Sequence, residues 1–171
     1  MLNPGRCIVK DLVGFLTEDE WELLCDCCAL CCLYKIQDED TNEIFYTSVI
    51  CPFLNKETTR CQCYAERFEK MPTCTKISPE TLSEIAYWLP KSCAYRCLYE
   101  GVQLPSWHPL FTDPTEEAAA LREKIADICV RPNTCIGWKT VDQVIQNSRV
   151  PRAGRNLTRL LINNVIEDID I

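Results

Sequence analysis

The segment from Cys25 to Cys32 reads CDCCALCC, with five cysteines in eight positions. A packed hydrocarbon core does not need so many thiols, and neighbouring cysteines in one short segment do not readily bond each other in standard disulfide geometry. Several thiolates can, however, bind one soft or borderline metal. The segment therefore predicts a site for zinc, iron or an iron–sulfur cluster.

The chain as a whole is rich in cysteine, with 14 in 171 residues. Short secreted proteins held by disulfides approach this content, but a chain of this length can bury a core without such crosslinks. Residues 1–15 hold no apolar run that resembles the core of a signal peptide, and the cysteines lie in close groups. We therefore expect metal-bound thiolates in a reducing cytoplasm.

Charge and hydropathy exclude two classes of partner from the expected function. The formal net charge of −7 disfavours binding to nucleic acid. No stretch approaches the roughly 20 apolar residues that a membrane span needs. We expect neither nucleic acid nor a membrane as a partner.

A capping box at residues 17–20, TEDE, predicts the start of a helix just before the cysteine run. At about 100° per residue, a helix that continued would place Cys25, Cys28 and Cys32 on one face. Cys31 would then face a second site or the core. If the segment is instead an irregular loop, all of these thiols can converge. The sequence leaves both geometries open.

The remaining pattern predicts short strands and short helices. Apolar and aromatic runs at 33–37 and 43–47 flank an acidic turn and predict a β-hairpin, and a second turn falls at 55–59. Capped helices are expected from Ser78 to Leu89, from Ser92 to Gly101 and from Asp113 onward.

The C-terminal third is expected to hold three further elements. These are a strand pair within 128–138, a short helix over 140–146, and a last helix capped by Asn156 after a linker at 151–155. The expected fold is thus α+β: a small metal-stabilised domain over residues 1–150, with short hairpins packed among helices, and a C-terminal helical extension over 151–171.

Motifs over about residues 18–111 resemble those of a known family. The matching positions are Trp21-Glu22, Leu24, Cys25-Asp26, Cys28, Cys31-Cys32, Asp38-Glu39-Asp40-Thr41, Tyr46-Thr47, Cys51, Cys61, Tyr64, Arg67, Cys74, Trp88-Leu89-Pro90, Cys93-Ala94-Tyr95-Arg96, Glu100-Gly101, Leu104-Pro105 and Trp107-His108-Pro109-Leu110. This pattern is similar to that of the bacterial CxxCxxCC cysteine-cluster proteins, in the YcgN branch of the YkgJ-type group. Those proteins are described as zinc- or iron-chelating, and their biochemical role is poorly defined. The tail from Pro151 onward lies outside the resemblance.

The resemblance implies a set of metal ligands. This family set is Cys25, Cys28, Cys31, Cys32, Cys51, Cys61, Cys74 and Cys93. The other cysteines are read as small buried hydrophobes or incidental thiols; they are Cys7, Cys27, Cys63, Cys97, Cys129 and Cys135. Cys27 stands where the family usually has glycine.

Several arrangements of these ligands are compatible with the sequence. The thiols can form two four-thiolate sites, or one site beside structural cysteines. Three close cysteines at positions 25, 28 and 31 with a distant Cys51-Pro52 resemble a ferredoxin pattern, but the same spacing serves zinc. The implied cofactor is iron or zinc, with an iron–sulfur cluster among the alternatives.

The sequence is compatible with three functions, and it does not decide whether the protein is an enzyme. The first reading is a metal-binding protein without its own catalysis. The second is an iron-dependent metalloenzyme with an open coordination position near Arg67, Arg96 and His108. The third is a zinc-stabilised interaction domain that uses the C-terminal helix as its partner surface. For His108 the competing interpretation is an imidazole hydrogen-bonded in a turn. For the two arginines it is ion pairs with the acidic residues at 38–40.

Overall fold

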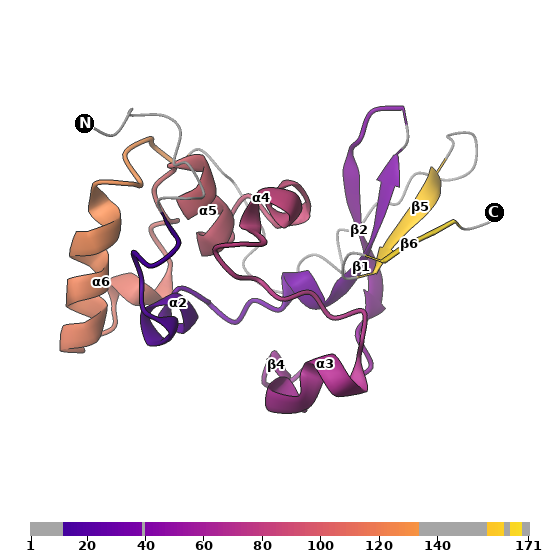
Figure 1. Cartoon of the computed structure of the whole chain (residues 1–171), viewed down its shortest axis with the longest axis horizontal. Helices are drawn as coiled ribbons and strands as arrows, with labels where there is room; N and C mark the ends of the chain where they lie inside the picture. The colour runs from indigo at the N-terminus through magenta and orange to yellow at the C-terminus, as the bar shows by residue number, and fades with distance from the viewer. Residues whose placement is uncertain (1–11, 39, 134–156, 163–164, 169–171) are drawn as a thin grey trace. The chain divides into compact units, whose positions relative to one another are not determined.

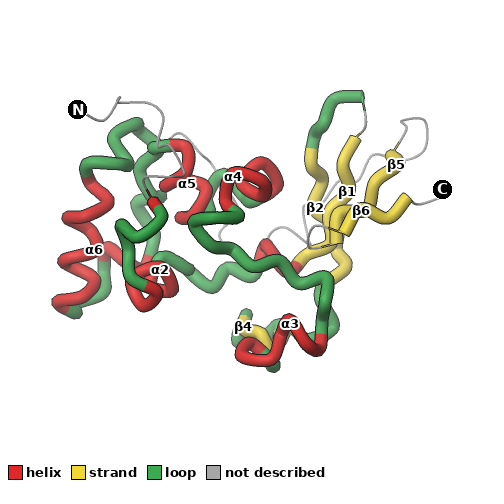
Figure 2. The backbone as a smooth tube through the Cα atoms, viewed as in Figure 1, coloured by secondary structure: helices red, strands yellow, loops and turns green. Residues whose placement is uncertain are grey.

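The computed structural model describes residues 12–38, 40–133, 157–162 and 165–168. They divide into two compact units. The first unit joins Met1–Asp26 with Lys76–Gly137, and the second joins Cys27–Thr75 with Trp138–Ile171, which includes the C-terminal strands. Helices make up the first unit, and the larger sheet lies in the second (Figures 1 and 2). The predicted α+β class is confirmed.

The first unit contains four α-helices among its described residues. They are α2 (Glu18–Leu23), α4 (Leu82–Ile85), α5 (Ala94–Glu100) and α6 (Glu116–Ala126), with 3-10 turns at Ala86–Trp88 and Pro109–Phe111. The predicted capping box is present, because Thr17 and Glu20 exchange backbone-to-side-chain hydrogen bonds. Thr115 caps α6 in the same way, by accepting from the N–H of Ala118. These caps satisfy N–H groups that a helix start leaves without partners.

Two helix boundaries differ from the prediction. The helix expected over 78–89 is α only at Leu82–Ile85 and then tightens into a 3-10 turn. The N-cap of α5 is Cys93, one residue later than the predicted Ser92. The predicted terminator Gly101 is confirmed, with φ 66° at the C-cap. A Cβ at this position would also lie 3.3 Å from the Ile128 carbonyl oxygen, so glycine is required there on both counts.

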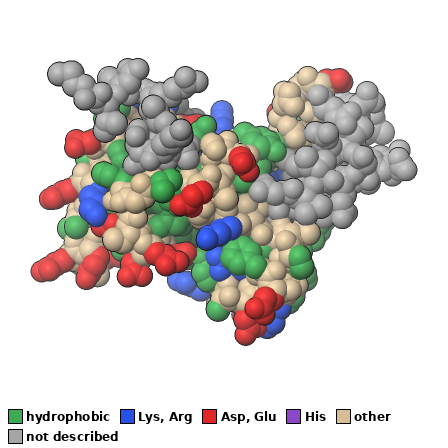
Figure 3. Space-filling model, in the orientation of Figure 1, with side chains coloured by type: hydrophobic (Ala, Val, Ile, Leu, Met, Phe, Trp, Pro, Cys, Tyr) green, Lys and Arg blue, Asp and Glu red, His purple; other side chains and the backbone are tan. Residues whose placement is uncertain are grey.

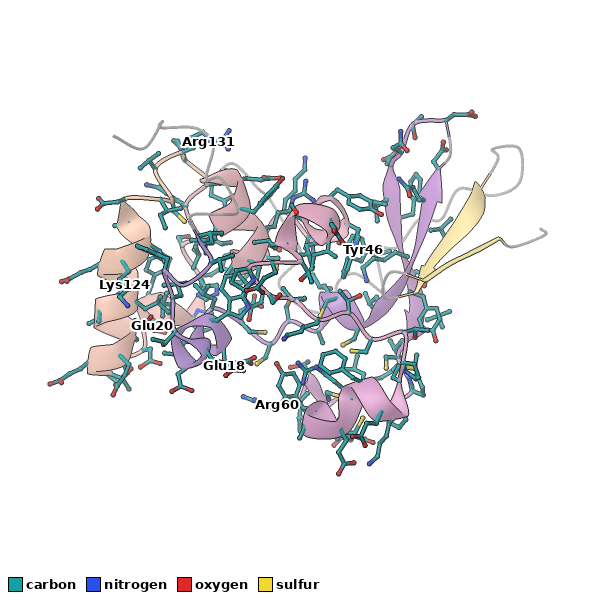
Figure 4. All side chains as sticks on the ribbon, in the orientation of Figure 1. Glu18, Glu20, Tyr46, Arg60, Lys124 and Arg131 are labelled. Atoms are coloured by element: carbon teal, nitrogen blue, oxygen red, sulfur yellow. The ribbon has the colours of Figure 1, made fainter. Side chains whose placement is uncertain are left out.

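Helix α2 is fixed to the rest of the first unit by Trp21. Its indole Nε1–H donates to the carbonyl oxygen of Ile77 at 2.9 Å, and its ring lies 4.7 Å from that of Tyr95. The Tyr95 hydroxyl in turn donates to the Trp21 carbonyl oxygen at 3.1 Å. An ion pair between Lys124 and Glu20 joins α6 to α2 at 2.5 Å (Figure 4). Helices far apart in sequence are thus held by polar contacts as well as by burial.

The second unit is built on a four-stranded antiparallel sheet. The strands are β1 (Leu33–Asp38), β2 (Ile44–Ile50), β5 (Leu157–Ile162) and β6 (Val165–Asp168), in the order β2-β1-β5-β6. A smaller hairpin pairs β3 (Leu54–Asn55) with β4 (Arg60–Cys61), and short helical turns follow at Tyr64–Glu66 and α3 (Arg67–Lys70). The hairpin predicted from the runs at 33–37 and 43–47 is confirmed, and the predicted turn at 55–59 falls between β3 and β4.

The predicted C-terminal helix is wrong. Residues 157–162 and 165–168 are strands, and β5 pairs antiparallel with β1. Their apolar residues fit helical spacing, but β-branched residues such as Ile162 and Val165 pack well in strands. These two residues pair in the register, and Asn163-Asn164, a residue type favoured in two-residue hairpin connections, stands between them in the sequence. The partner surface assigned to that helix stays a prediction.

Other C-terminal predictions fall on residues that the structure does not describe. The helix expected over 140–146, the linker at 151–155 and the boundary between 150 and 151 lie outside the described residues. The predicted strand pair within 128–138 is partly covered. There the described residues contain one isolated parallel bridge, between Val102 and Arg131.

The two units have very different cores. The first unit buries a dense set of large apolar side chains; among them are Trp21, Leu24, Leu82, Ile85, Trp88, Leu89, Tyr95, Leu98, Leu104, Leu110, Leu121 and Ile125. The buried cluster of the second unit comprises Ala29, Leu30, Leu33, Cys51 and Leu54. Partly buried residues that pack against it include Cys28 and Cys32. Thiols therefore take up interior volume that hydrocarbon occupies elsewhere.

The visible surface of the first unit is acidic. Asp and Glu side chains gather over α2 and α6 in Figure 3, and the exposed acidic residues there include Glu18, Asp19, Glu116 and Glu117. Among the described residues, the structure contains no helix long and apolar enough to cross a membrane.

The single histidine is buried in the first unit with both ring nitrogens occupied. His108 is 1% exposed. Its Nδ1 accepts from the N–H of Leu110, so the ring proton lies on Nε2, which is 3.1 Å from the Leu24 carbonyl oxygen and donates to it. Burial lowers the pKa of His108 below its usual value, although Asp26 and the bond to Leu24 act in the opposite direction. The hydrogen-bonded interpretation of His108 is therefore the correct one.

The Trp21–Tyr95 contact generates a first prediction. Tyr95→Phe removes the buried hydroxyl that bonds the Trp21 carbonyl oxygen and leaves the ring packing intact. We expect a loss of about 1 kcal/mol in the free energy of unfolding, the usual cost of one hydrogen bond. Tyr99→Phe, on the same helix, is the control and should change the value by less than about 0.5 kcal/mol. Equal losses in urea titrations of the two variants would contradict this assignment.

His108 generates a prediction about pH. Its folded pKa lies below the usual value of 6.5, so between these two values the unfolded chain binds a proton that the folded protein does not. Stability contributed by neutral His108 is therefore present above about pH 6.5 and decreases as the pH falls below it. His108→Gln removes this dependence. The stability difference between wild type and variant, measured in urea at about pH 7.5 and 5.5, should shrink at the lower pH. A constant difference would rule out this role.

Candidate metal centre

The cysteine run lies in an irregular loop, and the helical alternative is wrong. Helix α2 ends at Leu23, with Leu24 as its C-cap. Cys27 and Ala29 then adopt left-handed conformations, with φ of 55° and 59°, and a 3-10 turn at Leu30–Cys32 leads into β1. Left-handed residues cannot continue an α-helix. The loop geometry allows neighbouring thiols to turn toward a common region.

Cys31, Cys32 and Cys51 form the first part of this region. The Cys51 N–H donates to the Cys32 carbonyl oxygen at 2.9 Å, beside the pairing of Leu33 with Ile50. A hydrogen bond with Cys31 and burial raise the pKa of the Cys32 thiol, and Cys51 adds to this effect. The β1–β2 pairing thus brings together cysteines about twenty residues apart.

Cys61, Cys63 and Cys74 form the second part. The β3–β4 hairpin pairs Leu54 with Cys61, and the sulfur atoms of Cys61 and Cys63 lie 3.8 Å apart. Burial raises the pKa of the Cys74 thiol to about 11; Cys31, Cys51 and Cys61 also raise it, whereas Arg67 lowers it. Leu54, which pairs with Cys61, also donates to the Cys51 carbonyl oxygen at 3.0 Å, so the two parts adjoin. Cys31 and Cys51 raise the pKa of both Cys32 and Cys74. Figure 4 shows sulfur atoms gathered between β1 and α3.

This group, named here the thiol cluster, contains most of the predicted ligands. Its members are Cys28, Cys31, Cys32, Cys51, Cys61, Cys63 and Cys74, all in the second unit. Six of them belong to the predicted set of eight. Cys25, exposed after α2, and Cys93, the N-cap of α5, lie in the first unit. Their role as ligands stays a prediction.

Cys63 was excluded at the sequence level but lies within the cluster. Its side chain is 8% exposed. Burial raises the pKa of its thiol, and so do the hydrogen bond with Cys61 and the proximity of Cys51, while Lys70 lowers it. The signal that could have identified it is the C-x-C spacing with Cys61 in a tight hairpin, which keeps both side chains on the same side of the turn.

The donor set fits a thiophilic metal, although the site is not preassembled. Among the described residues, no three Cys, His, Asp or Glu side chains already surround a single point where an ion could bind. Side-chain rotation would have to complete the coordination. The buried hydroxyls of Thr73 and Thr75, on either side of Cys74, have no hydrogen-bond partner within the described part of the chain. Hydroxyls at these positions can donate hydrogen bonds to thiolate sulfur, and such bonds shift the reduction potential of iron–sulfur clusters.

A buried lysine accompanies the cluster, and the sequence reasoning missed it. Lys35 is 1% exposed, and its Nζ donates to the carbonyl oxygens of Leu33 at 2.6 Å and Cys31 at 3.0 Å. Burial lowers the pKa of the ammonium to about 8, while Cys31, Cys32 and Cys28 act to raise it. Strand alternation could have identified Lys35, because it lies two residues after Leu33 and therefore shares its inward face.

The two arginines differ in their surroundings. Arg67 lies over the rings of Tyr64 and Phe68, at 3.8 and 4.3 Å from their centroids, and lowers the pKa of Cys74. The Arg67 guanidinium thus favours the thiolate form of Cys74. Arg96 lies in the first unit and forms an ion pair with Glu100 at 2.8 Å. Its guanidinium also donates to the Leu89 carbonyl oxygen, so its role is structural.

The other extra cysteines fit a structural role where the structure describes them. Cys97 is fully buried in the first unit, and its thiol donates to the Lys91 carbonyl oxygen at 3.4 Å. Cys129 is 6% exposed in the same unit. Cys7 and Cys135 lie outside the described residues.

Comparison with known proteins agrees with this geometry. Residues 24–94 match the model of the CxxCxxCC family, described as a "Putative zinc- or iron-chelating domain". The matched range contains the whole thiol cluster and Lys35. No solved structure matches the chain.

Curated relatives match over a longer range. A UPF0260 protein of Klebsiella pneumoniae is 45% identical over 124 residues, which are 72% of this chain and 83% of that protein. A UPF0260 protein of Vibrio campbellii is 44% identical over 72% of this chain and 82% of its own length. The UPF0260 protein YcgN of Escherichia coli is 44% identical over 72% of this chain and 80% of its own length. The chain belongs to the UPF0260 family.

Proposed function

We propose that the protein binds zinc or iron through the thiol cluster of its second unit. The observation that carries this proposal is the convergence of thiols from separate segments. The Cys51 N–H donates to the Cys32 carbonyl oxygen, Cys28 and Cys32 pack against the buried cluster that contains Cys51, and the sulfur atoms of Cys61 and Cys63 lie 3.8 Å apart. Thiols packed this closely resist losing their protons together, because the thiolates would repel one another. A bound cation removes that repulsion, so the arrangement favours a metal over free thiolates.

The chemistry of the donors supports a closed thiolate site. Sulfur ligands select zinc, iron or iron–sulfur clusters, and the sole histidine has both ring nitrogens bonded to backbone. A metal held by four thiolates has no open position and acts structurally. The residues that would hold it come from the six family cysteines of the cluster, and we add Cys63 as a further ligand. When bound, the metal would supply crosslinks between the loop before β1, the end of β2, the β3–β4 hairpin and Cys74.

The core of the second unit supports the same role. Its described buried cluster contains Leu30, Leu33 and Leu54 together with Cys51, and the partly buried residues packed against it are Cys28, Cys32, Tyr46, Ile50, Phe53 and Met71. A bound metal would crosslink these segments and add its binding free energy to the stability of the unit, as it does in small domains with thiolate sites. The metalloenzyme alternative gains no such support, because the proton donor it would use, His108, is fully bonded.

The first experiment replaces one central thiol. Cys51→Ser should lower zinc affinity by more than the roughly 10- to 100-fold that loss of an outer-shell partner costs. Cys97→Ser, also at a buried cysteine, is the matched control and should retain the full metal content. Elemental analysis and chelator competition on protein purified without oxygen measure both effects, and they also distinguish zinc from iron. If Cys97→Ser lost the metal and Cys51→Ser kept it, the assignment of the site to the second unit would be wrong.

The second experiment removes the metal. If the bound metal stabilises the second unit, its removal by a chelator should increase the rate of amide hydrogen exchange in residues 27–75 much more than in residues 76–133. The first unit, with its dense apolar core, should keep its protection. Mass spectrometry of exchanged peptides measures both regions in one sample. A uniform loss of protection over both units, or none in residues 27–75, would contradict a structural metal in the second unit.

A further inference from the structure

Lys35 is the most deeply buried charged side chain in the described part of the second unit. It lies on β1, three residues after Cys32, and its Nζ is held by the carbonyl oxygens of Cys31 and Leu33. The same nitrogen lies 5.4 Å from the centroid of the Tyr46 ring on β2, labelled in Figure 4. Two backbone acceptors and an aromatic face fix the ammonium at this position.

Burying the Lys35 ammonium at this position carries a large desolvation cost. Moving an ammonium into a protein interior costs several kcal/mol even after relaxation, and a strand position facing a core usually holds an apolar residue. The ammonium contacts the carbonyl oxygen of Cys31 directly. It also lies beside Leu33 and Tyr46, which belong to the same packed group as Cys28 and Cys32. The lysine therefore holds its charge beside the loop that begins the thiol cluster.

We propose that the Lys35 ammonium is the resident countercharge of the thiol cluster and sets the affinity with which the second unit binds a divalent metal. This inference rests on the proposed function and assigns a positioning residue to it. Lys35 coordinates no metal, since an ammonium has three donors and no acceptor. It acts through the charge of the ligands.

The charge balance of metal binding explains the effect. When four protonated thiols take up one divalent cation, four protons leave and the site changes from neutral to a net charge of −2. A positive charge nearby stabilises the loaded state and leaves the neutral thiols almost unaffected.

Two neutral substitutions test the inference. Lys35→Met keeps most of the shape without charge, and Lys35→Gln keeps hydrogen-bond donors without charge. Lys56→Met, at an exposed lysine in the β3–β4 turn, is the matched control. Zinc affinity is measured by chelator competition on the full chain, and the absorption of the Co²⁺-loaded protein reports the number of thiolate ligands. We expect both Lys35 variants to bind zinc about tenfold or more weakly, with an unchanged Co²⁺ spectrum, and Lys56→Met to match the wild type.

Each alternative outcome overturns the inference in a recognisable way. Zinc affinity within twofold of wild type in the Lys35 variants would refute the countercharge and leave the proposed function intact. A changed Co²⁺ spectrum, or failure of both variants to fold, would show that Lys35 shapes the loop instead. A wild-type protein that binds neither Zn²⁺ nor Co²⁺ would refute the proposed function itself, and this inference with it.

Discussion

In the described part of the second unit, thiols share the interior with a few leucines and with partly buried aromatic and aliphatic side chains, and the arrangement of this unit depends on that mixture. The loop before β1, the end of β2 and the β3–β4 hairpin converge on this mixed core. Thiols pack like small apolar side chains, so the metal-free arrangement is compact. They cannot, however, supply the transfer free energy of large aliphatic residues. The stability of this unit is therefore tied to what the sulfur atoms bind.

The first unit is instead built around hydrocarbon side chains. Large aliphatic and aromatic residues meet there at ordinary packing, and polar groups inside it have backbone partners, as with Trp21, Tyr95 and His108. His108 also constrains the backbone just before the cysteine run. Its Nε2–H holds the Leu24 carbonyl oxygen, directly before Cys25, and so fixes the point from which the chain leaves the helical unit.

The sequence was sufficient to predict the local features that depend on strong short-range signals. The capping box at Thr17, the terminator Gly101 and the hairpin of β1 and β2 all use residues whose chemistry selects one backbone conformation. The left-handed residues in the cysteine run could not be predicted this way, because neither cysteine nor alanine favours positive φ. Glycine adopts such a conformation without strain, whereas Cys27 and Ala29 adopt it here with a side chain present.

The candidate site was predicted in part for a similar reason. Cysteine spacing identifies thiols, but only strand pairing shows that Cys51 lies beside Cys32, and only the β3–β4 turn shows that Cys63 accompanies Cys61. The C-terminal hairpin was missed because its apolar residues satisfy helical and strand spacing equally, and long-range pairing with β1 decides between them. Lys35 was overlooked because a lysine in a strand is normally read as solvent-facing.

The bond between Trp21 and Ile77 has a consequence for the order of folding. It joins residues 56 positions apart, and most of the second unit is the chain between them. The helical unit must therefore close a long loop before its core can form, and non-local closure of this kind slows folding. A metal that orders residues 27–75 early would replace a flexible loop by a compact insertion whose ends are already close. The bound ion would then lower the entropy cost of closing the helical unit around the Trp21–Ile77 bond.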